Sequence, residues 1–120
     1  MSRKNIEKYI PQAIKVLNAK FSDGKVPSSY NGYISSFGAS IMQSGLSPTL
    51  ALFENKNAST KEVKSVLTEL ILSILDEKSQ ESSLLLYTLQ KGKAKEKQLK
   101  QQIMDIAVAI KLSIRTFELV

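Results

Sequence analysis

The chain has 120 residues, 42% of them hydrophobic and 23% charged, and this length predicts one domain over residues 1–120 with a sizeable core. It contains no cysteine and no histidine, which excludes disulfides, Cys/His zinc sites and catalysis by either side chain. Seventeen basic and 11 acidic residues give a net charge of +6, which suits a polyanionic partner or serves only solubility.

Apolar residues recur at three- and four-residue spacing along almost the whole chain, which predicts helices and no strand. The first helix is expected over residues 2–21, capped by Ser2 and kinked at Pro11, and a loop is expected at 22–29. The second and third helices are expected at about 29–44 and 48–55. A fourth helix should begin at a capping box of Ser59 or Thr60 with Glu62 and end at a break at 79–82. Two more helices are expected at 84–89, before a stop at Gly92, and at 94–118. The predicted fold class is all-α, a compact single-domain bundle of about five to six helices.

Two of these helices are expected to meet at a one-residue turn. Gly45 directly follows a helix and fits the left-handed conformation, so Ile41 and Leu46 would form the hydrophobic pair of a Schellman cap. Ser47 and Pro48 are typical of an N-cap and a first helical residue. The sequence therefore predicts a tight turn between the two helices.

No ionised side chain occurs between Tyr33 and Phe53, and one whole face of the 29–44 helix is uncharged. Opposite its apolar stripe this face carries Gly32, Ser35, Ser36, Ala39 and Gln43. A surface helix normally shows Lys and Glu there, whereas small neutral residues allow another backbone to approach closely. We therefore expect the face to be covered, either by other helices of the same bundle, which is the simpler interpretation, or by another protein.

Two helices joined at Gly-Leu-Ser also resemble a DNA-reading helix-turn-helix. That motif needs a small residue about four positions before the turn glycine, where this chain has Ile41. Its second helix must present polar side chains to the bases, and here only Thr49 precedes Glu54 in the second helix. Sequence-specific DNA binding is therefore not expected.

The same stretch resembles a protein family. Its helix led by Tyr33 is followed by an apolar residue, Gln43, one further residue, and then Gly45 and Leu46, before a second helix that reads Thr-Leu-Ala-aromatic. The end of the terminal helix, "KLSIRTFE" with Arg115, is a second match. These residues resemble the small all-helical subunit of the type III-B CRISPR (Cmr) effector complex.

This resemblance implies a non-catalytic structural subunit with no cofactor. In the family, copies stack head to tail as a minor filament beside the subunits that hold the guide RNA, and they help to line the groove where target RNA pairs. The implied partners are other Cmr subunits, copies of the chain itself, and the phosphates of guide and target RNA, in antiviral defence. The candidate family-motif or protein-interface residues are Tyr33, Gln43, Gly45 and Leu46.

Two ridges of basic residues are the candidates for phosphate contacts. The first ridge comprises Lys4, Lys8 and Lys15, opposite the apolar stripe of the 2–21 helix. The second ridge, on the terminal helix, comprises Lys97, Lys100, Lys111 and Arg115. Lysine contacts to phosphate carry no base specificity. The apolar residues Met104, Ala107 and Val108 lie within the second ridge and either form a contact surface with it or widen the core stripe.

No other pattern indicates catalysis, a metal site or a membrane. Asp76 and Glu77 are adjacent and point in different directions, so a solvated helix end is expected. The serines have no histidine base, and the glycines are too scattered for a phosphate-binding loop. No apolar run reaches ~18 residues and no signal-peptide core is present, so a cytoplasmic protein is expected.

Two functions of different classes fit the sequence. The first is an accessory subunit of an RNA-guided, RNA-targeting complex. Its RNA contacts would use the basic ends of the chain: residues 1–25 have six basic and two acidic side chains, residues 26–90 four and six, and residues 91–120 seven and three. The alternative is a free-standing helical adaptor that binds only protein and whose charge is merely solubilising.

Overall fold

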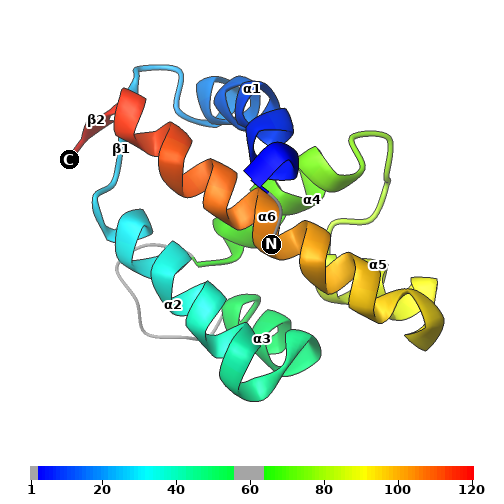
Figure 1. Cartoon of the computed structure of the whole chain (residues 1–120). Coiled ribbons are helices and arrows are strands. Elements are labelled where there is room, and N and C mark those ends of the chain that lie inside the picture. The colour runs from blue at the N-terminus through cyan, green and yellow to red at the C-terminus, as the bar shows by residue number, and fades with distance from the viewer. Residues whose placement is uncertain (1–2, 56–63) are drawn as a thin grey trace.

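The structure is a computed structural model that describes residues 3–55 and 64–120, and it confirms the all-α class. Its helices are α1 (Arg3–Lys20), α2 (Ser29–Ser44), α3 (Leu46–Phe53), α4 (Ser65–Leu75), α5 (Leu84–Lys91) and α6 (Glu96–Ser113) (Figure 1). Short 3-10 turns, η1 (Lys93–Lys95) and η2 (Ile114–Thr116), flank α6, and the strands are β1 (Lys25–Val26) and β2 (Glu118–Leu119). The radius of gyration, 13.4 Å, is that of a compact chain of this length.

Helix α6 is the central element of the fold. It contacts α1, α2, α4 and α5, and Figure 1 shows it running between α1 and α2 with α4 behind it. Its buried positions cover a wide arc and include Leu99, Ile103, Ile106, Ala109 and Ile110. The interpretation that α2 is enclosed within its own bundle is therefore wrong, because α6 occupies the centre and α2 packs against it with one face only.

Helix α2 faces the core with the stripe that its spacing predicted. The buried residues of this helix are Tyr30, Ile34, Phe37 and Ile41. The ring of Phe37 meets that of Phe53 in α3 edge-on, with centroids 5.1 Å apart and planes at 78°. This pair fixes α3 against the same face of α2 that packs on α6.

The turn between α2 and α3 differs from its predicted form. Gly45 has φ 94° and ψ 171°, so its φ is positive as expected but its ψ is extended instead of left-handed. Its N–H donates to the Ile41 carbonyl at 3.0 Å, and α3 begins at the next residue, Leu46, instead of at residue 48. Pro48 is thus the third residue of α3, which is tolerated because N–H groups in the first turn have no helical partner.

Thr49 stabilises this turn from inside the protein. Its Oγ1 donates to the Gly45 carbonyl at 2.9 Å and shares a hydrogen bond of 2.8 Å with Ser40 Oγ of α2. The Thr49 side chain is fully buried. It cannot reach the bases of a nucleic acid, which agrees with the exclusion of a helix-turn-helix reader.

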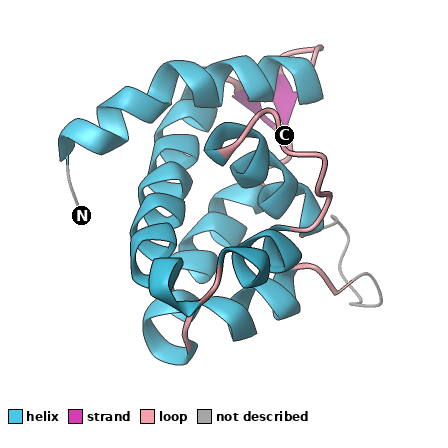
Figure 2. Cartoon of the chain, turned by 90° about the vertical axis from the view of Figure 1, so that its right-hand side faces the viewer, coloured by secondary structure: helices cyan, strands magenta, loops and turns pink. Residues whose placement is uncertain are grey.

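Two short strands were not predicted from the sequence. β1 and β2 pair in parallel, with Lys25 opposite Glu118 and Val26 opposite Leu119. The terminal helix therefore ends at Ser113 instead of at residue 118, and the strand pair lies at one end of the bundle (Figure 2). Helices α1 and α6 run in the same direction, because their N-terminal halves line one groove and their C-terminal ends line another cavity. The segments that follow the two helices, which contain β1 and β2, are therefore brought together.

Three further predicted features concern Pro11, the break at 79–82 and the ends of helices. Helix α1 continues through the exposed Pro11 as one element. The break at 79–82 and the stop at Gly92, which has φ 85°, are confirmed. The predicted caps at Ser2 and at Ser59 or Thr60 with Glu62 lie outside the described residues.

Candidate functional site

The first basic ridge lies along α1. Lys4, Lys8 and Lys15 are all exposed, on the side of α1 away from its buried residues. In residues 3–55 and 64–120 none of these lysines forms an ion pair, whereas Arg3 pairs with Glu7 at 3.6 Å. Their ammonium groups are therefore available to an external anion.

The second ridge is divided into two ends. Lys97 is exposed and Lys100 half-buried near the start of α6, whereas Lys111 lies about 21 Å further along the axis than Lys97. Arg115 is exposed and belongs to η2, not to the helix. Lys111 Nζ donates to Ser35 Oγ of α2 at 2.7 Å. This end of the ridge therefore borders α2 and is separate from the start of α6.

Two of the three apolar residues within the second ridge belong to the core. Ala107 is buried and Met104 packs against the core cluster, so these two residues widen the core stripe of α6. Val108 is half-buried and is not among the residues packed against the core. A contact surface that combines lysines with Ala107 and Met104 is therefore not supported.

A groove between α1 and α6 brings one lysine of each ridge together. It has a volume of about 630 Å³, and its lining includes Asn5, Lys8 and Tyr9 from α1 and Lys97, Gln98 and Gln101 from α6. Amide and ammonium groups therefore converge from two helices that lie far apart in the sequence. This arrangement can donate several hydrogen bonds to a polar or anionic ligand.

Two side chains that were not predicted as site residues, Gln101 and Asp105, also line this groove. Asp105 lines the groove although it is only 1% exposed, and Gln101 Nε2 donates to its Oδ1 at 3.0 Å. The signal in the sequence is the four-residue spacing of Gln101 and Asp105, which is equally typical of a solvated surface pair. The burial of the carboxylate follows from the packing of α1 over α6.

The uncharged face of α2 is exposed. Its residues Gly32, Ser35, Ser36, Ala39 and Gln43 are all exposed, and Met42 beside them is 69% exposed. This face is thus a second surface without charge, next to the end of the basic ridge at Lys111. Its coverage by the same bundle is thus wrong, and its contact with another protein stays a prediction.

Most of the family-motif residues have a role in the fold. Leu46 is a core residue, Gly45 forms the turn, and Tyr33 is half-buried with Lys64 Nζ 5.3 Å from its ring centroid. Gln43 alone projects from the surface. The motif therefore marks the packing of α2 on α3 and leaves one side chain for an external contact.

The model of one protein family, described as CRISPR-associated protein (Cas_Cmr5), matches residues 3–114. The chain belongs to the Cas_Cmr5 family. The match extends from α1 through α6 and confirms the resemblance indicated by the residues around Gly45 and at the end of α6. The protein is thus a subunit of the CRISPR Cmr complex and associates with other Cmr subunits. No curated protein and no solved structure matches the chain.

Acidic residues of this Cas_Cmr5 chain stabilise the connection from α4 to α5. Asp76 follows the end of α4, and its Oδ2 accepts a hydrogen bond of 3.2 Å from Tyr87 Oη. Burial, then the negative charge of Asp76 and this hydrogen bond, raise the pKa of Tyr87 above its usual value. The prediction of a solvated helix end is confirmed for Glu77, which is exposed. It is wrong for Asp76, which is half-buried and accepts a hydrogen bond.

Glu54 binds the N-terminus of α5 from another part of the Cas_Cmr5 fold. Its carboxylate accepts hydrogen bonds from Ser83 Oγ and from the Leu85 backbone N–H, the latter at 2.9 Å. Ser83 Oγ in turn accepts from the Leu86 N–H at 3.1 Å. An anionic group at a helix N-terminus is favourable because unpaired N–H groups and the helix dipole meet there. The role of Glu54 is therefore structural.

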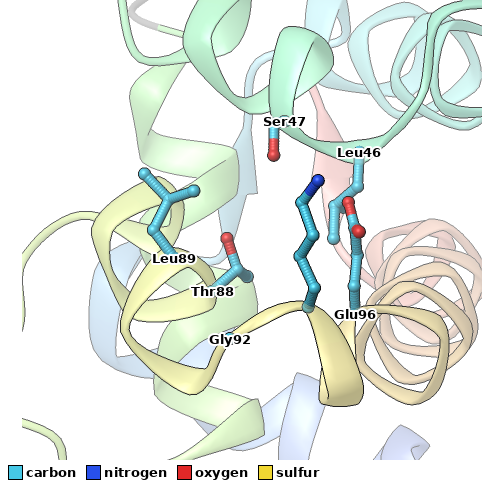
Figure 3. Close-up of a pocket in the computed structure, with 7 residues that line it drawn as sticks. Leu46, Ser47, Thr88, Leu89, Gly92 and Glu96 are labelled. Carbon is cyan, nitrogen blue, oxygen red and sulfur yellow. The ribbon is translucent and has the colours of Figure 1, made fainter.

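A smaller hollow of about 200 Å³ lies where α3 begins and α5 ends (Figure 3). The hydroxyls of Ser47 and Thr88 and the side chains of Leu46 and Leu89 surround it. Across residues 3–55 and 64–120 no three potential metal ligands are grouped. No helix in the same part of this Cas_Cmr5 chain is long and apolar enough to cross a bilayer.

Proposed function

We propose that this Cmr subunit is a non-catalytic, cytoplasmic protein that stacks with copies of itself as a minor filament and helps to hold guide and target RNA in antiviral defence. The observation that carries the RNA-holding role is the groove between α1 and α6, which both Lys8 and Lys97 line. The excess of positive charge at the two ends of the sequence therefore lies on two neighbouring helices, α1 and α6. The ligand that fits such a surface best is a polyanion.

Phosphate contacts explain the type of residue in both ridges. An ammonium group is a compact charge with rotatable donors, so it accepts phosphate without a demanding geometry. Lys4, Lys8, Lys15 and Lys97 are exposed and form no ion pair among the described residues. A subunit that must hold any guide and target sequence needs contacts of this sequence-independent kind.

The uncharged face of α2 supports a protein contact on another side of the molecule. Figure 1 shows α1 and α2 on opposite sides of α6. The small residues Gly32 and Ala39 on this face allow close approach of a neighbour, and Met42 supplies exposed apolar area. One copy can therefore contact a neighbouring subunit through α2 while the groove between α1 and α6 contacts RNA.

The proposed non-catalytic role is supported by the types of side chain in the sequence. It has neither histidine nor cysteine to act as a base or nucleophile. The carboxylates of Glu54 and Asp76 accept hydrogen bonds from Ser83 and Tyr87 within the fold. Both are thus occupied by structural contacts.

The test uses the reconstituted Cmr complex and two double charge reversals. Lys8→Glu with Lys97→Glu changes the groove, and Lys111→Glu with Arg115→Glu changes the far end of the second ridge. Each variant should capture less target RNA and should lower the slope of log affinity against log salt by about 1 to 2, because about 0.7 to 0.9 arises from each lost phosphate contact. Lys78→Glu, an exposed reversal outside both ridges, is the matched control and should change neither quantity.

The melting temperature separates an RNA effect from a folding defect. Exposed charges contribute little to stability, so Lys8→Glu with Lys97→Glu should leave it nearly unchanged, whereas Lys111→Glu also removes the hydrogen bond to Ser35 and should lower it slightly. If both double reversals left RNA capture and its salt slope intact, the ridges would be solubilising charge only. The adaptor function would then replace the RNA-holding role, and Ala39→Arg on the exposed α2 face would be expected to block incorporation of the subunit.

A further inference from the structure

The hollow where α3 begins and α5 ends is open to solvent and has apolar walls. Its volume of about 200 Å³ is below the range of about 300 to 1,000 Å³ that is typical of small-molecule sites. Leu46 and Leu89 line it, and Leu89 is 58% exposed (Figure 3). A hollow of this size and lining suits one apolar side chain of a protein partner.

The outward sides of α3 and α5 extend this apolar surface. The exposed residues of α3 are Pro48, Ala51 and Leu52, and the helix has no charged side chain. Leu86 is exposed on α5, which packs beside α3. Exposed apolar residues that gather on neighbouring helices indicate an interaction surface. This surface is separate from the uncharged face of α2.

Two opposite charges lie at the hollow. Lys93 of η1 and Glu96 of α6 both line it, and both are exposed. In residues 3–55 and 64–120 neither forms an ion pair. Residues three apart on a helix have Cβ atoms about 5 to 6 Å apart. A partner that fits must therefore present an anion and a cation at similar spacing, next to an apolar side chain.

The strand pair β1–β2 presents such a set. Lys25 lies opposite Glu118, and neighbouring strands are about 4.7 to 4.9 Å apart. Both side chains are exposed, and within the described ranges neither forms an ion pair. Val120 is on the same face as Glu118, because side chains two apart on a strand point the same way. It is 65% exposed, and its N–H donates to the Val26 carbonyl at 2.9 Å, which holds it in the ladder.

The hollow and the strand pair lie at opposite ends of α6 (Figure 1). Glu96 at the hollow is the first residue of α6, and the helix ends at Ser113, about 26 Å further along its axis. The two surfaces therefore cannot meet within one molecule. A contact between them joins two different surfaces of two copies, and such a heterologous contact can repeat from copy to copy.

We propose that the hollow holds the β1–β2 pair of a second copy of this chain, with Val120 as the apolar anchor. Glu118 then meets Lys93, and Lys25 meets Glu96. The inference rests on the stacking of copies proposed above and assigns its two surfaces. The groove between α1 and α6 shares no lining residue with the hollow, so the same copy can still contact RNA.

Cysteine cross-linking tests the contact directly, because the chain has no cysteine of its own. Lys93→Cys and Glu118→Cys are combined in one chain, which is assembled into the Cmr complex and treated with a short bismaleimide. A disulfide is unsuitable, since two residues that meet through long side chains lie further apart than its Cα separation of about 5.5 to 6 Å. A ladder of covalent multimers of this chain is expected. Each single variant, and Lys78→Cys with Glu118→Cys, should give no ladder.

The second charge pair provides a rescue in the same cross-linking chain. Glu96→Lys should lower the yield of multimers about two- to fivefold, as expected for an exposed ion pair, and adding Lys25→Glu should restore it. Val120→Asp should abolish the ladder while the far-UV circular dichroism spectrum stays unchanged. A functional anchor and a lost fold are thereby distinguished.

Three results would overturn the assigned contact. They are a ladder as abundant with the control pair, a yield that Glu96→Lys leaves unchanged, and cross-links that join position 93 to a different Cmr subunit. Native mass spectrometry of the same complexes separates this failure from that of the stacking itself. Several copies per complex without the expected ladder would refute only the assigned surfaces, whereas a single copy per complex would refute the stacking as well.

Discussion

Gly45→Ala tests an unusual backbone conformation that Gly92 shares. With φ 94° and ψ 171°, Gly45 lies in a region that is essentially restricted to glycine, and a residue forced into it costs about 1 to 3 kcal/mol. A Cβ added there would lie 3.9 Å from Pro48 Cδ, an ordinary van der Waals distance, so no steric clash adds to this cost. Alanine also restricts the unfolded chain, which offsets about 0.4 to 1 kcal/mol.

The net loss in the free energy of unfolding is therefore about 0 to 2.6 kcal/mol; its midpoint of about 1.3 kcal/mol corresponds to roughly 5 °C in melting temperature for a chain of this size. Gly38→Ala is the matched control in the same helix. It lies inside α2, an added Cβ would meet no heavy atom within 4 Å, and alanine is favoured over glycine in a helix by about 0.5 to 1 kcal/mol. The same chemical change is thus expected to have opposite signs at the two positions.

Urea unfolding followed by far-UV circular dichroism measures both variants, and equal m-values would show that the midpoints report stability. If Gly45→Ala unfolded at the same or a higher urea concentration than Gly38→Ala, the reasoning about the turn would be refuted. Gly45→Asn provides a second check. Asparagine tolerates the left-handed region but not this extended one, so it should not restore stability. Full recovery with asparagine would favour the left-handed turn first predicted from the sequence.

Three further changes probe the structure and the absence of catalysis. Glu54→Gln should destabilise the fold by about 1 to 2 kcal/mol, because it removes a partly buried anion from the N-terminus of α5. Glu81→Gln is the control and should have little effect. Equal urea midpoints of the two variants would contradict the role of Glu54 in binding the α5 N-terminus. The raised pKa of Tyr87 means that the unfolded chain loses this proton first, so stability should fall as pH rises from about 10 through the higher folded pKa, and Tyr87→Phe should show a smaller fall over that window. Purified protein should cleave no RNA with Mg²⁺ or Mn²⁺; cleavage that co-purifies with it and is lost in Asp76→Asn would show an enzyme.

The position of Lys111 affects how the charge reversals are read. Its Nζ donates to Ser35 Oγ on the exposed face of α2, so Lys111→Glu also alters the border of the surface proposed for protein contact. Arg115 in η2 has no such link to α2 among the described residues. A loss of subunit incorporation with Lys111→Glu but not with Arg115→Glu would therefore indicate that the α2 face, and not RNA binding, had been disturbed.

The sequence by itself determined the local structure and much of the identity of this protein. The three- and four-residue spacing of apolar residues set the helices, since that period depends only on helix geometry. Gly45 and Gly92 marked two helix ends because only glycine adopts their positive φ readily. The lack of histidine and cysteine and the residues around Gly45 indicated a non-enzymatic relative of the Cmr subunit, and the family membership is confirmed.

Tertiary structure alone decided which surfaces are covered. Both α2 and α6 have the periodicity of a packed helix, and only the packing of α1, α2 and α4 around α6 placed α6 in the centre and left Ala39 and Gln43 exposed. Three features depend in the same way on α1 lying beside α6 in the same direction: the pairing of β1 with β2, the groove lined by both Lys8 and Lys97, and the burial of Asp105. Local patterns fix the period and ends of a helix, whereas contacts between segments distant in sequence are fixed by how complete helix surfaces fit together.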